Sequence, residues 1–140
     1  MVQDNSMRLQ SWALLATGLG IIAFWGLFFT VGLAPVDPPP CYFAFEHSFP
    51  VPDLTLAVGL IASGVNILTK ATWGGNVSLV CAGGLLFLGL IDLSFGLQNG
   101  GFTGPFLEAL QSGLISAWCI ILGIWIIMTR AGLLRPAFSG

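Results

Sequence analysis

Four long apolar runs follow one another along the chain, separated by stretches of turn residues or proline. They cover residues 9–33, 53–70, 77–97 and 106–128. A helix needs about 20 apolar residues to cross a bilayer, and continuous runs of this length predict helices rather than strands. We therefore expect an all-α integral membrane protein in which four antiparallel spans form a helix bundle, a single transmembrane domain over residues 1–140.

The composition supports this class. Hydrophobic residues make up 56% of the 140 residues and charged residues only 7%, whereas a soluble domain carries about a quarter charged residues. The first run has no small-x-small cleavage site after it, so we expect it to be retained as a span. Comparison of the two halves indicates no tandem or inverted repeat.

The connection between the first and second runs is rich in proline. Residues 34–52 hold six of the eight prolines. Proline fixes φ and lacks a backbone donor, so we expect a stiff, extended outer loop and no regular helix in this segment. The aromatic residues between the prolines are too apolar to extend into water, and we expect them to hold Glu46 and His47 against the bundle or the headgroups.

The charges are distributed asymmetrically. With four spans, every basic residue lies on the side of the two termini: Arg8, Lys70, Arg130 and Arg135. The positive-inside rule then predicts that both termini are cytoplasmic. Five of the six acids belong to the outer half: Asp37, Glu46, Asp53, Asp92 and Glu108.

Asp92 lies inside the third apolar run. On a helix it shares one face with Gly89 and Gly96, and small residues on a membrane helix mark the side that another helix approaches. The sequence therefore predicts that Asp92 faces protein and not lipid. A carboxylate within a span costs about 3 kcal/mol on insertion scales, which favours a paired or functional role.

Helix positions near the outer surface bring several polar residues to a similar depth. The predicted ligand-binding residues are Asp92, Glu46, His47, Asp53 and Glu108. Three interpretations remain open: helix caps and dipole partners, with Asp53 capping the second span; a site for a cation or an amine; or carboxylates that share a proton. We assign no metal, because a single histidine is too few for the usual zinc site.

No catalytic motif is present. The three cysteines are far apart, without CxxC spacing, and serine-hydrolase, P-loop and dinucleotide motifs are absent. We assign no catalytic residue, and the sequence indicates no particular cofactor.

Two functional hypotheses follow. The first is a non-enzymatic accessory or structural subunit of a larger membrane complex. The alternative is an ion- or small-molecule-binding membrane protein, including an enzyme or a proton-coupled carrier, with an acidic site at the outer face. The expected partners are the lipid bilayer and other membrane subunits or further copies of the chain, and no nucleic acid.

Overall fold

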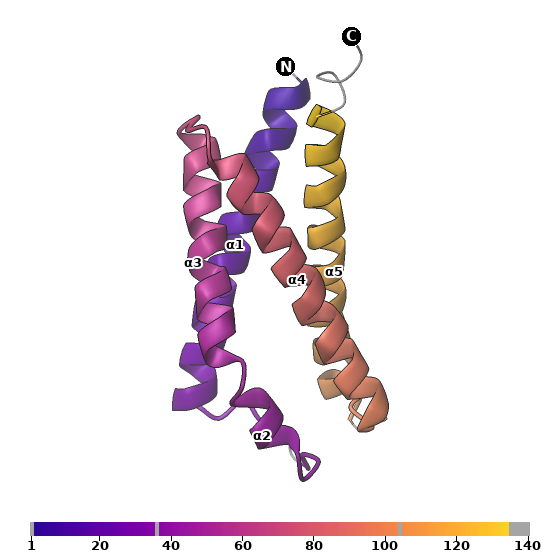
Figure 1. Ribbon diagram of the computed structural model, residues 1–140. Coiled ribbons are helices and arrows are strands. Elements are labelled where there is room, and N and C mark those ends of the chain that lie inside the picture. Colours follow the sequence, from indigo (N-terminus) through magenta and orange to yellow (C-terminus); the bar gives the residue numbers. More distant parts are fainter. Residues whose placement is uncertain (1, 36, 104, 135–140) are drawn as a thin grey trace. The chain divides into compact units, whose positions relative to one another are not determined.

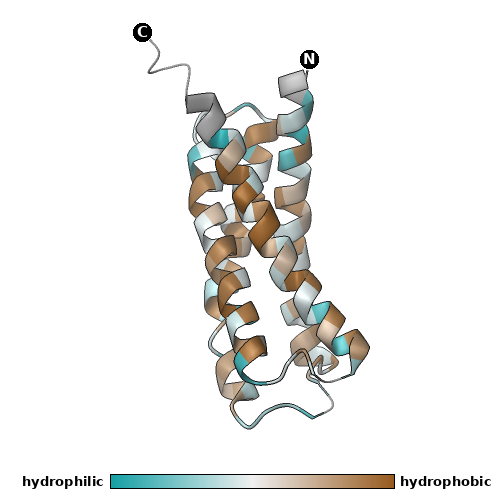
Figure 2. Cartoon of the chain, turned by 90° about the vertical axis from the view of Figure 1, so that its right-hand side faces the viewer, coloured by the Kyte–Doolittle hydropathy of each residue, from teal (hydrophilic) through white to brown (hydrophobic). Residues whose placement is uncertain are grey.

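The computed structural model describes residues 2–35, 37–103 and 105–134, with side chains from residue 5 to residue 130 of these ranges. In this part of the chain all regular structure is helical: α1 (Val2–Thr30), α2 (Tyr42–Glu46), α3 (Pro50–Leu68), α4 (Gly74–Gln98) and α5 (Phe106–Leu134) (Figure 1). Four of these helices are long and apolar enough to cross a membrane, and hydrophobic residues predominate along them (Figure 2). The predicted all-α class is confirmed.

The chain divides into two compact units, Met1–Ser78 and Leu79–Gly140. The first unit contains α1, α2, α3 and the start of α4, and the second contains the rest of α4 with α5. Each unit is described by itself below. That the two form one antiparallel bundle and one domain stays a prediction.

In the first unit, α1 and α3 pack with their backbones close together. A β-carbon added at Gly18 would lie 2.9 Å from the carbonyl oxygen of Ala57, and one added at Gly64 would lie 2.9 Å from that of Ser11. The earlier residue of α1 in these contacts thus faces the later residue of α3, so the two helices are antiparallel. No side chain larger than hydrogen fits at either glycine without a shift of the facing backbone.

In the second unit, α4 and α5 pack through glycine contacts of the same kind. A β-carbon at Gly89 of α4 would lie 2.7 Å from the carbonyl oxygen of Ser116, and one at Gly123 of α5 would lie 2.9 Å from that of Ala82. Close approach of this kind is typical of membrane helices, where small residues allow van der Waals contact between backbones. α4 and α5 are antiparallel as well.

The four long helices share one pattern. Each carries a buried serine or alanine seven residues before its buried glycine, namely Ser11 and Gly18, Ala57 and Gly64, Ala82 and Gly89, and Ser116 and Gly123. Seven residues are close to two helical turns, so both members lie on the face toward the partner helix. In each pair of helices, each glycine faces the carbonyl of the partner's small residue.

The two helix pairs therefore repeat one contact pattern in tandem, which the comparison of the two halves of the sequence does not indicate. Equivalent positions are 71 residues apart in α1 and α4 but 59 residues apart in α3 and α5. The longer connection in the first pair, which contains α2, accounts for the difference. Leu14 of α1 corresponds to Leu85 of α4, and both are fully buried.

The proline-rich segment is partly helical, contrary to the prediction of an extended loop throughout. α2 forms between the two groups of prolines, and α3 begins at Pro50 rather than at Asp53. The first turn of a helix has backbone N–H groups without intrahelical partners, so Pro50 and Pro52 are tolerated there. Residues 32–35 and 37–41 are not helical.

Of the four glycines in the first apolar run, only Gly18 packs closely. Gly18 meets α3, as described above. Gly26 is exposed, and a β-carbon there would meet no described atom within 4 Å. Gly32 follows the end of α1 with a φ of 79°, a left-handed conformation that favours glycine, so it serves the turn and not helix packing.

Candidate functional site

The first unit contains a buried polar pair that joins its two long helices. The indole Nε1–H of Trp25 on α1 donates a hydrogen bond of 3.0 Å to Oδ2 of Asp53 on α3. The two residues are only 3% and 8% exposed, respectively. Trp25 lies seven residues beyond Gly18, on the same face of α1, so the glycine contacts set the helix spacing at which this bond forms.

The pairing follows from the chemistry of the two groups. A buried indole N–H usually finds an acceptor, and a buried carboxylate is costly unless it accepts hydrogen bonds. The predicted role of Asp53 as a helix cap is wrong, because α3 begins at Pro50 with Phe49 at the N-cap and no side-chain cap bond. Asp53 is still in the first turn, where its charge complements the helix dipole.

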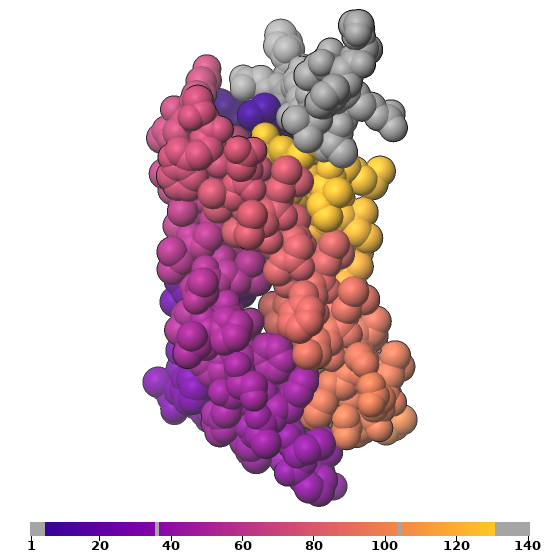
Figure 3. Space-filling model, in the orientation of Figure 1, coloured from indigo at the N-terminus to yellow at the C-terminus, as the bar shows by residue number. Residues whose placement is uncertain are grey.

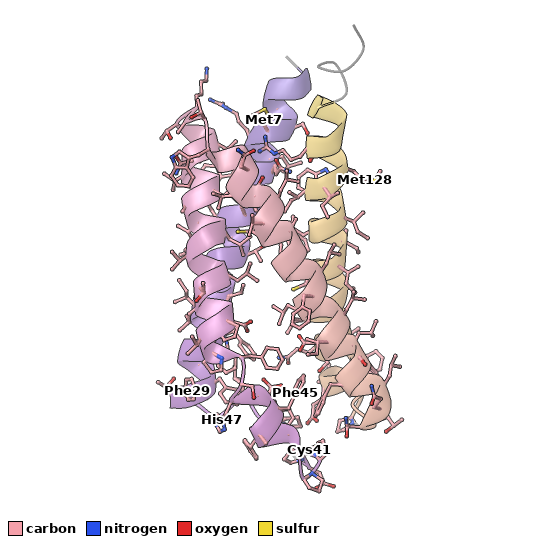
Figure 4. All side chains as sticks on the ribbon, in the orientation of Figure 1. Met7, Phe29, Cys41, Phe45, His47 and Met128 are labelled. Atoms are coloured by element: carbon pink, nitrogen blue, oxygen red, sulfur yellow. The ribbon has the colours of Figure 1, made fainter. Side chains whose placement is uncertain are left out.

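Aromatic rings continue from this pair toward α2. Trp25, Phe28, Phe29, Phe43 and His47 form what we call the aromatic cluster. The ring of His47 lies 6.2 Å from each of the three phenylalanine rings, nearly parallel to Phe29 at 11°, and Phe29 in turn stacks on Trp25 at 5.7 Å. Phe29 and His47 are close together at one end of the first unit in Figure 4.

The aromatic cluster holds α2 against the end of α1. Ring pairs at these separations contribute about 1 kcal/mol each beyond the area that they bury. Phe45, on the same short helix, packs against Phe49 at the start of α3, with ring centroids 4.7 Å apart. In the space-filling view the residues of α2 form a continuous surface with the start of α3 (Figure 3). His47 is exposed and Glu46 is half-buried.

The second unit places its two acids near the connection between its helices. Asp92 lies six residues before the end of α4, and Glu108 lies in the first turn of α5. Both are half-buried. The prediction that the face of Gly89 and Gly96 contacts protein is confirmed, since Gly89 meets α5 and a β-carbon at Gly96 would lie 2.7 Å from the ring of Phe102.

The repeat shows that the buried polar pair belongs to the first unit alone. The positions equivalent to Trp25 and Asp53 are Gly96 and Ser112. Ser112 is exposed, and the ring of Phe102 from the connecting segment lies against Gly96. Within each pair the two helices thus make the same glycine contacts. The two pairs differ at the end that carries the acids.

The predicted acidic site is divided between the two units. Glu46, His47 and Asp53 are in the first, and Asp92 and Glu108 are in the second. Among the described residues no group of three or more His, Cys, Asp or Glu side chains is arranged to hold a metal ion. Convergence of all five residues stays a prediction. Cys81 and Cys119 are buried thiols, and Cys41 is exposed.

No family model, curated protein or solved structure matches the chain. The class is therefore defined by the fold alone. An all-α chain whose described part includes four helices long and apolar enough to cross a bilayer indicates an integral membrane protein.

Proposed function

We propose that the chain is a non-enzymatic accessory subunit of a larger membrane complex. The observation that supports this role is an open small-residue face on α1, formed by Ala16, Gly20 and Ala23. All three residues are exposed, and a β-carbon at Gly20 would meet no described atom within 4 Å. On the helical wheel this face is opposite the side that packs on α3.

An exposed glycine in a helix calls for an explanation. Glycine within a helix costs about 1 kcal/mol relative to alanine. Gly83 on α4 is exposed too, but large exposed side chains flank it, whereas Gly20 lies between Ala16 and Ala23. Small residues spaced four and three positions apart allow the backbone of another helix to approach closely. The open face of α1 is therefore suited to a helix from a neighbouring chain.

The hydrogen bond that Asp53 accepts also supports a structural role for the chain. The Asp53 carboxylate accepts a hydrogen bond from Trp25 within the same unit, so its presence in a span is accounted for by helix packing. No more than 33% of the apolar window of any span is buried inside the chain. Much of the helical surface is thus available to lipid and to partner subunits.

A matched pair of variants tests the accessory role. Gly20→Leu would fill the open face of α1, whereas Gly83→Leu adds the same side chain at an equally open glycine on α4. We expect native mass spectrometry of protein extracted from its own membrane to show several different chains. Gly20→Leu should lower the amount of co-extracted partner at least tenfold, and Gly83→Leu should not. A lone wild-type chain, or equal retention by both variants, would contradict the proposal.

We further propose an antiparallel four-span topology with the proline-rich segment outside and both termini in the cytoplasm. The support is the basic charge of Arg8, Lys70 and Arg130. Arg135, which completes this set, lies outside the described residues.

Cys41 offers a direct test of this topology, because it is exposed while Cys81 and Cys119 are buried. A membrane-impermeant maleimide added to intact cells should label the wild-type chain and not Cys41→Ser. Labelling of Cys41 only after the membrane is permeabilised would show that the orientation is the opposite of the one proposed.

A ligand site is the second candidate function. The observation in its favour is that Asp92 and Glu108 are both half-buried and lie near the same connection of the second unit. These two carboxylates would bind a cation or an amine. Participation of Glu46, His47 and Asp53 stays a prediction. In the mass spectra, a single chain or homo-oligomer with a small adduct that Asp92→Asn removes would favour this function over the accessory role.

A further inference from the structure

Arg130 lies on α5, two residues after the end of the apolar run 106–128. Its Nε and Nη2 atoms are both buried, and neither makes a hydrogen bond within the described part of the chain. A guanidinium has five N–H donors and is always charged. The residue as a whole is half-buried, but these two donors are shielded from water, and shielding a donor is unfavourable unless an acceptor pairs with it.

The two unpaired nitrogens lie on one edge of the guanidinium. Nε–H and one N–H of Nη2 point in parallel along this edge, which matches two oxygens of a carboxylate or a phosphate. A partner that used both donors would form a bidentate pair, whereas a single carbonyl or hydroxyl would leave one donor unsatisfied. The geometry thus favours an oxyanion.

Among its described residues the second unit supplies no such oxyanion near Arg130. Glu108 lies 22 residues earlier on the same helix, which is about 33 Å at 1.5 Å per residue. Asp92 lies beyond Gly89 on α4, and Gly89 packs at the level of Ser116, more than three turns of α5 away from Arg130. Neither carboxylate of this unit can pair with the guanidinium.

We propose that Arg130 binds a phosphate group through Nε and Nη2. Its position at the end of a membrane span is the level of the lipid headgroups, where phosphates are abundant. Basic side chains at the cytoplasmic ends of membrane helices attract anionic lipids, and arginine is suited to bidentate phosphate binding. The phosphodiester of an anionic lipid is therefore the expected source, with free phosphate as the other source of the same chemistry.

The test uses the full-length protein, purified in a mild detergent and delipidated, then incubated with phosphatidylglycerol. Native mass spectrometry measures how much lipid stays bound as the collision energy rises. Arg130→Gln should lower the retained phosphatidylglycerol at least tenfold, because it removes the charge and the donor edge. Arg8→Gln is the matched control, since Arg8 is exposed, and it should retain lipid as the wild type does.

Arg130→Lys provides a second variant that keeps the charge and loses the bidentate edge. It should retain several-fold less lipid than the wild type but more than Arg130→Gln, and it keeps the test decisive if Arg130→Gln does not fold. Equal retention by the wild type and both Arg130 variants would overturn the proposal. Displacement of the lipid by millimolar inorganic phosphate would overturn the assignment to a lipid source, and insensitivity to inorganic phosphate would support it.

Discussion

Gly89→Ala should lower the free energy of unfolding by about 2 kcal/mol, although alanine is the better helix former. A β-carbon at this position would lie 2.7 Å from the carbonyl oxygen of Ser116 and 2.8 Å from the side chain of Ile120. The carbonyl belongs to the backbone of α5, so α4 and α5 would have to move apart. Unfolding in mixed micelles by denaturing detergent measures the loss.

The control for this substitution lies on the same helix. Gly83 is exposed, and a β-carbon there would meet no described atom within 4 Å. Gly83→Ala should therefore raise the free energy of unfolding by up to about 1 kcal/mol through helix propensity alone. If the two alanine variants were equally stable, the close backbone contact between α4 and α5 would not exist in the membrane.

Trp25→Phe should also be strongly destabilising, by about 2 kcal/mol, because it leaves the carboxylate of Asp53 buried without the indole donor. Asp53→Leu should cost about 1 kcal/mol, since it leaves the indole N–H unpaired. The double variant Trp25→Phe/Asp53→Leu removes both polar groups and should be close to the wild type in stability.

The double-mutant cycle separates a structural pair from independent residues. Strong non-additivity in detergent unfolding is expected for two groups that bond only to each other. If the losses of the two single variants simply added, the hydrogen bond of Trp25 to Asp53 would carry no stability, and Asp53 would return as a candidate ligand-binding residue. Trp12→Phe serves as a control, because Trp12 is exposed on the same helix.

The long helices could be predicted from the sequence because their signal is strong and local. An apolar run of sufficient length specifies a helix wherever it packs, and all four predicted runs fall within or overlap α1, α3, α4 and α5. The start of α3 was predicted three residues too late. Proline disfavours the interior of a helix, but Pro50 and Pro52 occupy the first turn, which tolerates it.

The repeat could not be found from hydropathy. Serine, alanine and glycine have similar, near-neutral hydropathy, so a small residue followed seven positions later by glycine produces no peak. The 12-residue difference between the two connections also shifts the halves out of alignment. The pattern becomes visible in all four helices only when the buried small residues that lie two turns apart are compared.

The Trp25–Asp53 pair was missed for a related reason. The sequence predicts a helix cap at Asp53, and no local pattern marks Trp25, which lies in an uninterrupted apolar run, as its partner. Only the register between α1 and α3, fixed by Gly18 and Gly64, brings the two side chains together. Asp92 is half-buried, and its convergence with the other acids depends on tertiary arrangement that local patterns do not specify.

The repeated glycine contacts join two pairs of long helices, and in each pair the two helices are neighbours in the sequence. α1 pairs with α3, and α4 pairs with α5, so each pair is complete once its second helix has been synthesised. Helices that are individually stable in lipid associate after insertion, and contacts between sequence neighbours form fastest. During biosynthesis the first hairpin can therefore acquire its final packing while the ribosome is still translating the second.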